Sequence, residues 1–122
     1  PNGMAIDREA NRARLVGSKE ERPICVLWDL DQQAAVATYE DSGCGDGVIH
    51  EPSLGCFLVA ASCLPGGPAV SIFAGASCQL MAMIRTAPGA SWVAFDPVIQ
   101  RVFTPATTST GPALLSFRMP TL

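Results

Sequence analysis

The sequence has no apolar run of about 18 residues or more, the length that a transmembrane helix requires. It also lacks a basic segment followed by an apolar core near its start, so no signal peptide is visible. The chain carries 8 Lys and Arg against 11 Asp and Glu, and the cations are scattered. A nucleic-acid surface needs a basic patch, so neither a nucleic acid nor a membrane is an expected partner.

Motifs of several well-known chemistries are also missing. None of the five cysteines forms a CxxC pair, and the single His50 is not spaced from any of them as in a zinc site. There is no G-x-S-x-G sequence and no phosphate-binding loop. We expect mostly reduced, buried cysteines. An oxidising compartment would leave open a bridge between Cys56 and Cys63.

What the sequence does contain is an internal repeat. Successive members of several residue columns are 44 or 45 residues apart. Three such columns are Asn2, Asp46 and Ser91; Asp7, Glu51 and Asp96; and Trp28, Phe73 and Phe117. Because independent columns share one period, chance is a poor explanation.

Each repeat holds short apolar runs separated by turn-forming residues. The runs are 3–6, 13–17, 24–28 and 34–39, then 47–50, 56–60, 69–73 and 79–84, then 92–95, 101–104 and 113–117. Short strands at regular spacing indicate an all-β protein. About 40 to 45 residues with four strands is typical of a β-propeller blade. We therefore predict four-stranded antiparallel blades at 1–44 and 45–89, and three strands of a last blade at 90–122.

Such a set of blades is an incomplete ring, because a closed propeller needs about four to eight blades. Apolar faces and unpaired edges at the two ends would invite association. We expect other blades as partners, from a homo-oligomer or from the remainder of a longer chain. The chain begins at Pro1 without an initiator Met, so we expect a processed protein or a piece of a longer one. A remnant without function is a further possibility.

The stretches "AIDREANRARLVG", "DGVIHEPSLGCFLVAAS" and "WVAFDPVIQRVFTPA" resemble the repeats of the bacterial YVTN-type, YncE-like propellers. The resemblance implies a scaffold that binds a ligand or a protein without chemistry of its own. It also implies a periplasmic or secreted location. Two positions depart from the family pattern, at Glu51 and at Ser62-Cys63.

The openings "PNGMAID" and "GDGVIHE" are also similar to those of gluconolactonase-like propellers. That resemblance implies a divalent metal such as Ca²⁺ at Asn2 and Asp46, within part of a metal-dependent lactone hydrolase. Oxygen ligands suit such a cation, which would polarise a carbonyl and activate water. The third opening, Ser91-Trp92, offers no carboxylate.

Each of these residues also has a structural interpretation. Asn-Gly and Asp-Gly, at Asn2 and Asp46, are common turn dipeptides. The column of Asp7 recurs in every repeat and so is expected to shape the first turn of each blade. His50 replaces an apolar residue and is expected to be packed.

The aromatic column of Trp28 is expected to pack between blades. Trp92 and Ser91 lie beside the expected channel mouth and are the candidate ligand-binding residues. Filling of the channel is the favoured role of Trp92. No cofactor is required by this interpretation, and the divalent metal belongs to the hydrolase alternative.

Overall fold

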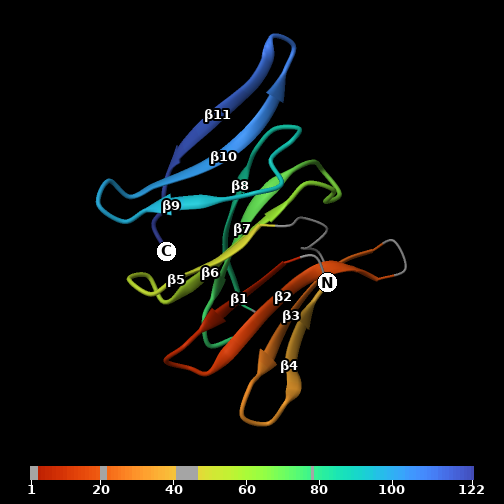
Figure 1. The fold of residues 1–122 in the computed structure, drawn as a ribbon, viewed down its shortest axis with the longest axis vertical. Coiled ribbons are helices and arrows are strands. Elements are labelled where there is room, and N and C mark those ends of the chain that lie inside the picture. The colour runs from red at the N-terminus through yellow and green to blue at the C-terminus, as the bar shows by residue number, and fades with distance from the viewer. Residues whose placement is uncertain (1–2, 20–21, 41–46, 78) are drawn as a thin grey trace.

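A computed structural model of the 122-residue chain describes residues 3–19, 22–40, 47–77 and 79–122 (Figure 1). Every regular element within these ranges is a strand. The strands are β1 (Gly3–Asp7), β2 (Arg12–Lys19), β3 (Arg22–Asp29), β4 (Ala34–Tyr39), β5 (Val48–Glu51), β6 (Cys56–Ala61), β7 (Ala69–Ala74), β8 (Leu80–Arg85), β9 (Ala94–Asp96), β10 (Arg101–Thr108) and β11 (Gly111–Arg118). None of the described segments forms a helix long and apolar enough to cross a bilayer.

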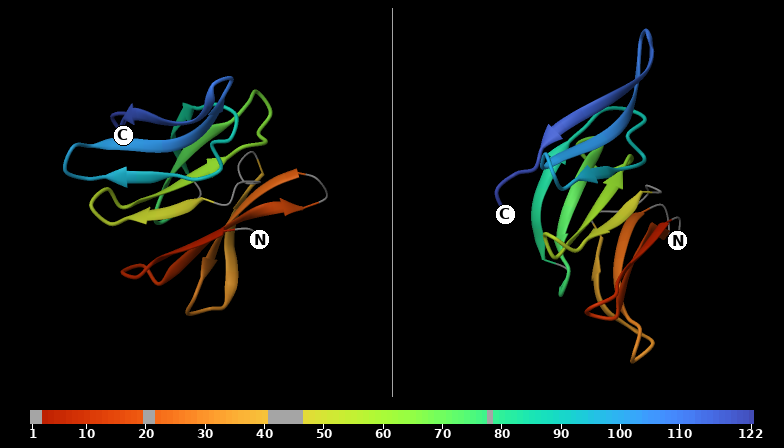
Figure 2. Two further views of the ribbon diagram at one scale, coloured as in Figure 1. Left: turned by 45° about the horizontal axis from the view of Figure 1, so that its top comes forward. Right: turned by 60° about the vertical axis from the view of Figure 1, so that its left-hand side comes forward.

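The strands form three antiparallel sheets, each built from consecutive strands. Their orders are β1-β2-β3-β4, β5-β6-β7-β8 and β9-β10-β11, and we call them the first, second and third blade. The three blades fan out one behind another, with the second between the other two (Figure 2). The all-β prediction of propeller-like blades in an incomplete ring is confirmed.

The first turn of each blade has one design, which explains why an acidic column recurs. Asp7 Oδ1 accepts hydrogen bonds from the backbone N–H groups of Glu9 and Ala10. A left-handed residue follows four positions after each acidic residue, with positive φ at Asn11 (54°), Gly55 (61°) and Gln100 (55°). The acidic side chain satisfies the turn amides, and the left-handed residue returns the chain into the next strand.

Two apolar cores lie between the blades. The core between the first and second blades includes Val16, Leu27, Phe57 and Phe73, each at most 1% exposed. The core between the second and third blades contains Leu58, Ile72, Val93 and Val102, and Phe117 packs against it. Because β6 and β7 contribute to both cores, they are the most completely buried strands of the molecule.

Two expectations about single residues need correction. Phe73 and Phe117 pack between blades, but Trp28 follows Leu27 on β3 and lies on the opposite face, away from the second blade. The suggested bridge between Cys56 and Cys63 is wrong, because Cys63 is disulfide-bonded whereas Cys56 is a free thiol. Burial, and then the nearby Glu51 carboxylate, raise the pKa of Cys56 to about 11.

Candidate functional site

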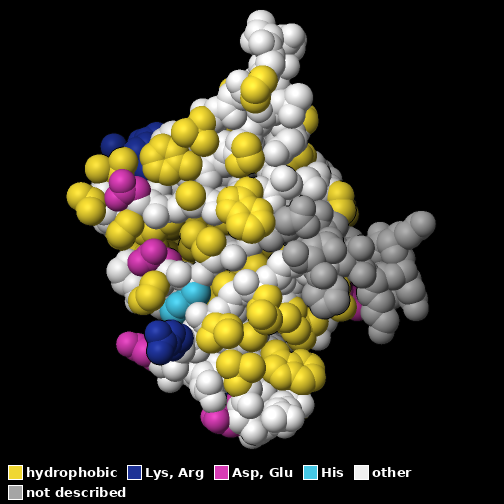
Figure 3. Space-filling view, viewed as in Figure 1, with side chains coloured by type: hydrophobic (Ala, Val, Ile, Leu, Met, Phe, Trp, Pro, Cys, Tyr) yellow, Lys and Arg dark blue, Asp and Glu magenta, His cyan; other side chains and the backbone are white. Residues whose placement is uncertain are grey.

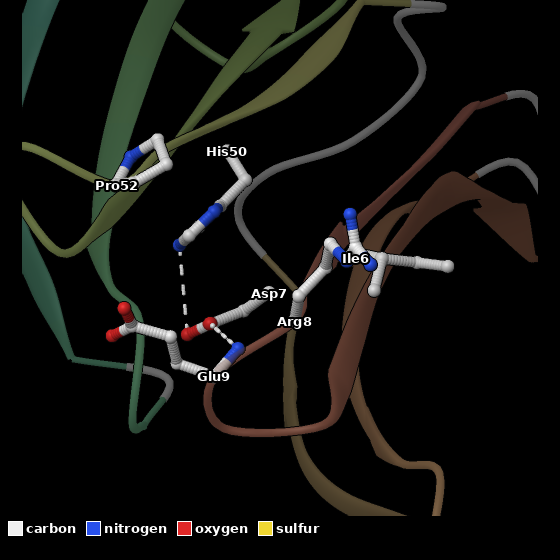
Figure 4. A pocket seen from close by; sticks show the side chains of 6 residues that line it. All are labelled: Ile6, Asp7, Arg8, Glu9, His50 and Pro52. Carbon is white, nitrogen blue, oxygen red and sulfur yellow. Dashed lines mark hydrogen bonds and ion pairs between the residues drawn. The ribbon is translucent and has the colours of Figure 1, made fainter.

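A pocket opens at the boundary between the first and second blades, beside the β1–β2 turn (Figure 4). Its volume is about 330 Å³. The lining side chains are Ile6, Asp7, Arg8, Glu9, His50 and Pro52. The first four come from the end of β1 and its turn, and the last two from β5 and the turn after it. The stacking of two blades therefore creates this pocket.

Asp7 contributes a buried carboxylate to the pocket and is 8% exposed as a whole residue. Its Oδ1 atom is used by the turn amides, so Oδ2 is the oxygen turned toward the second blade. The carboxylate lies against Gly75, where an added Cβ would be 3.2 Å from Asp7 Oδ2 and 2.8 Å from the carbonyl oxygen of Gly55. A side chain at Gly75 would thus crowd Asp7 and the β5–β6 turn.

His50 faces this carboxylate from the opposite blade, as Figure 4 shows. Its Nε2 atom lies 3.5 Å from Asp7 Oδ2. The ring packs on Phe57, with 4.8 Å between the ring centroids. Nε2 is buried and makes no hydrogen bond to any residue in the described part of the chain. Since a buried polar atom is nearly always satisfied, this nitrogen is the unusual feature of the pocket.

The pocket combines two buried polar atoms with a charged, exposed rim. Arg8 and Glu9 lie at the surface, whereas Ile6 and Pro52 supply apolar contact. Asp7 Oδ2 accepts hydrogen bonds, and neutral imidazole accepts at one nitrogen and donates at the other. The arrangement can therefore hold a small group that donates a hydrogen bond between the two blades.

The residues singled out in the sequence lie elsewhere. Ser91 and Trp92 precede β9 and contact the start of the second blade, where the backbone N–H of Gly47 donates to the carbonyl oxygen of Ser91 over 2.9 Å. An added Cβ at Gly47 would lie 2.7 Å from Trp92 Cα, so only glycine fits there. Trp92 is 54% exposed as a whole residue.

The two proposed metal ligands, Asn2 and Asp46, lie outside the described residues. Among the residues that are described, no group of three or more His, Cys, Asp or Glu side chains is placed to hold a metal. The divalent-metal hypothesis therefore stays a prediction.

Sequence reasoning passed over the pocket, although one signal was present. His50 occupies the column of Ile6 and Phe95, and a polar residue in an apolar column is worth following. Its meaning depends on the facing residue of the preceding blade, Asp7, which belongs to a different column. Stacking of the blades brings these two columns together.

Comparison with known proteins supports the fold but does not identify a function. No family model and no curated protein matches the chain. A chain of Kuenenia stuttgartiensis hydrazine synthase is similar in structure, with a TM-score of 0.78 and 13% identity over 97% of this chain. Sqt1 from Saccharomyces cerevisiae gives a TM-score of 0.71 and 12% identity over 98% of this chain.

Both neighbours have β-propeller-type folds, and this chain is built of the same kind of antiparallel blades. At these identities the likeness concerns the fold alone. The chain spans 34% of the hydrazine synthase chain and 31% of the Sqt1 chain. Their activities and partners therefore carry no direct implication for it.

Proposed function

We propose that this chain is a propeller-type binding scaffold, without chemistry of its own, that holds a small ligand with a hydrogen-bond-donating group such as an ammonium. The observation that carries the proposal is the buried Nε2 of His50, which lacks a hydrogen bond within the described structure and faces Asp7 Oδ2 in a pocket. A ligand group that reaches both atoms from the pocket would give Nε2 a hydrogen-bond partner. Its remaining atoms would contact Ile6 and Pro52.

The volume and charge of the pocket favour a small cationic ligand over an anionic one. About 330 Å³ is at the lower end of the range for small-molecule sites. Asp7 is the buried charge, and Glu9 adds a second carboxylate at the rim, whereas the cation Arg8 is exposed to water. A buried carboxylate favours a bound cation more strongly than an exposed guanidinium opposes it.

The inner ends of the blades offer a second binding surface. Trp92 is about half exposed as a whole residue and lies beside Ser91, at the start of the third blade. An exposed Trp gives a large contact area with one polar N–H group. We keep these two residues as proposed ligand contacts for a partner at the ring axis. The disulfide at Cys63 supports an exported location, because disulfides persist in oxidising compartments.

Proton NMR of the imidazole ring tests the pocket directly, since His50 is the only histidine in the chain. We expect small primary amines to shift the ring resonances of His50 and carboxylic acids of the same size to leave them in place. In Asp7→Asn the amide oxygen can still accept the bonds of the turn, but the charge is lost. Amine binding should weaken at least about tenfold in this variant, as expected for a charge-assisted bond.

Two outcomes would remove the proposal. One is a set of ring resonances that no amine shifts. The other is amine binding of equal strength in Asp7→Asn and in the unaltered chain.

The alternative function, part of a metal-dependent lactone hydrolase, has its own test. Ca²⁺ should raise the unfolding temperature of the chain and should do so less in Asp46→Ala, because a ligand that binds only the folded state stabilises it. An equal response of both proteins to Ca²⁺ would remove Asp46 as a ligand.

A further inference from the structure

Each blade has two faces, and the two inter-blade cores show which face is which. We call the face toward the preceding blade the leading face and the face toward the following blade the trailing face. On the second blade, Phe57 and Phe73 lie on the leading face, against the first blade. Leu58 and Ile72 lie on its trailing face, against the third blade. Strand alternation and the observed register extend the assignment to all blades.

The leading face of the first blade is apolar, and no other blade in the described part of the chain packs on it. It consists of Met4, Ile6, Ala13, Leu15, Val26 and Trp28. Met4 is 60% and Ile6 45% exposed, whereas Val48 and Val93, which occupy the column of Met4, are 6% and 1% exposed. Figure 3 shows a cluster of hydrophobic side chains over β1–β3, with charged side chains at its margin.

The trailing face of the third blade is the other uncovered end. Phe103 on β10 lies 45 residues after Leu58 and 89 after Arg14, and both of those are fully buried. Leu114, opposite Pro105 on the same face, is 68% exposed. Arg101 and Arg118 are paired across the strands at the end of this face. The face therefore presents apolar side chains beside two cations and the carboxylate of Asp96, which is opposite Arg101 in the β9–β10 register.

The contact between the first two blades shows how an arginine in the column of Arg101 can bind the following blade. The Arg12 guanidinium donates to the carbonyl oxygen of Ala76, in the β7–β8 turn of the next blade, over 2.6 Å. Arg101 occupies the column of Arg12, 89 residues later. Its guanidinium instead folds back on Ser116, at 2.6 Å from the hydroxyl oxygen. No carboxylate in the described part of the chain pairs with Arg101.

The first blade carries a negative charge, complementary to Arg101, at the position equivalent to Ala76. Asp31 lies 45 residues before Ala76, at the same place in the β3–β4 turn, and is exposed. The two turns match, because Leu30 and Gly75 each donate their N–H to the left-handed residue of the neighbouring turn, Asn11 or Gly55. A blade that docked its trailing face on the first blade would thus bring its arginine to Asp31.

We propose that the chain associates head to tail, with the trailing face of the third blade of one copy packed on the leading face of the first blade of a second copy. In this contact Arg101 of one copy pairs with Asp31 of the other. Phe103 takes the position of Arg14, over Trp28 and beside Ala13. Two copies supply six blades, which lies within the range of closed propellers. A contact of this heterologous kind closes into a ring or extends into a filament.

Sedimentation equilibrium of the 122-residue chain over a wide concentration range tests the contact. We expect reversible association in the unaltered chain. Arg101→Glu and Asp31→Arg should each weaken it at least about tenfold, because each places like charges together. Combining the two substitutions restores opposite charges and should recover most of the affinity.

Arg85→Glu serves as the matched control. It makes the same change in net charge as Arg101→Glu, but at an exposed arginine on β8 outside both faces, and should leave the association unchanged. A monomer at every concentration would overturn the proposal. So would an association that both single charge reversals leave intact, because the chains would then meet through another surface such as the free edge of β11. Failure of the pocket proposal at His50 would affect neither result.

Discussion

Arg14 is the residue whose environment departs most from expectation, since an arginine is rarely buried without exposure of its charged end. It is 0% exposed, in a column that holds Leu58 and Phe103 in the other blades. Its guanidinium carbon lies 4.7 Å from the ring centroid of Phe73 and 4.9 Å from that of Phe57. The aromatic faces stabilise the cation, and the neighbouring backbone supplies acceptors.

The hydrogen bonds of Arg14 join the first blade to the β7–β8 turn of the second. Its Nη2 atom donates to the carbonyl oxygens of Ser77 at 2.6 Å and Ala74 at 3.2 Å. Arg14→Met keeps most of the side-chain volume but leaves these carbonyl groups without this donor. We expect the free energy of unfolding to fall by roughly 2–4 kcal/mol.

Urea unfolding measures this change, and Arg85→Met is the control. Arg85 donates to the Gly67 carbonyl oxygen at an exposed site, so its loss should cost less than about 0.5 kcal/mol. Equal stability of Arg14→Met and the unaltered chain would mean that apolar packing alone holds this interface.

At the scale of single elements, the turns contain residues other than glycine in the left-handed backbone conformation, which is strained. Gln33 ends the β3–β4 turn with a φ of 53°, a region that residues other than glycine enter at a cost. Gln33→Gly should therefore raise the free energy of unfolding by about 0.5–1 kcal/mol, the relief of strain being partly offset by the greater freedom of glycine in the unfolded chain.

The reverse change in the first turn of the second blade gives a complementary test. Gly55 has a φ of 61°, and an added Cβ would meet nothing within 4 Å, so backbone conformation is the only expected cost. Gly55→Gln should lower the free energy of unfolding by about 1 kcal/mol in the same urea titration. The two variants should therefore change the free energy of unfolding in opposite directions. Changes in the same direction would mean that the left-handed backbone conformation does not decide the stability of these turns.

The strands could be predicted because the repeat aligned their apolar runs, and every predicted run falls in or directly beside an observed strand. The ends were harder to predict. β10 continues to Thr108, because cross-strand pairing with β11 extends the ladder beyond the apolar residues. The polar His50 in an apolar column was the one sequence signal of the pocket. Its partner Asp7 could not be predicted, since the two residues meet only when two blades stack, and periodicity within one chain does not reveal which faces are opposed.

At the scale of the whole molecule, the blades are unequal because the second alone is covered on both faces. Amide hydrogen exchange should show this inequality. We expect the amides of β6 and β7 to exchange at least about tenfold more slowly than those of β4 and β11, which lie at sheet edges and have exposed side chains. Mass spectrometry of peptides from each strand measures the rates. A single rate across all hydrogen-bonded strands would show that the three blades open only as one unit.

The buried arginine also bears on how the repeats find their correct order during folding. Similar repeats can pack against the wrong neighbour, and misassembly is a characteristic failure of repeat proteins. If the first blade met the third, Arg14 would face Val102 and Phe117 in place of the two phenylalanines. Only Phe117 would then offer an aromatic ring, so the buried guanidinium would lose one of its two cation–π contacts. The weaker stabilisation of this buried cation would penalise that arrangement, so one residue helps to specify the sequence in which the blades assemble.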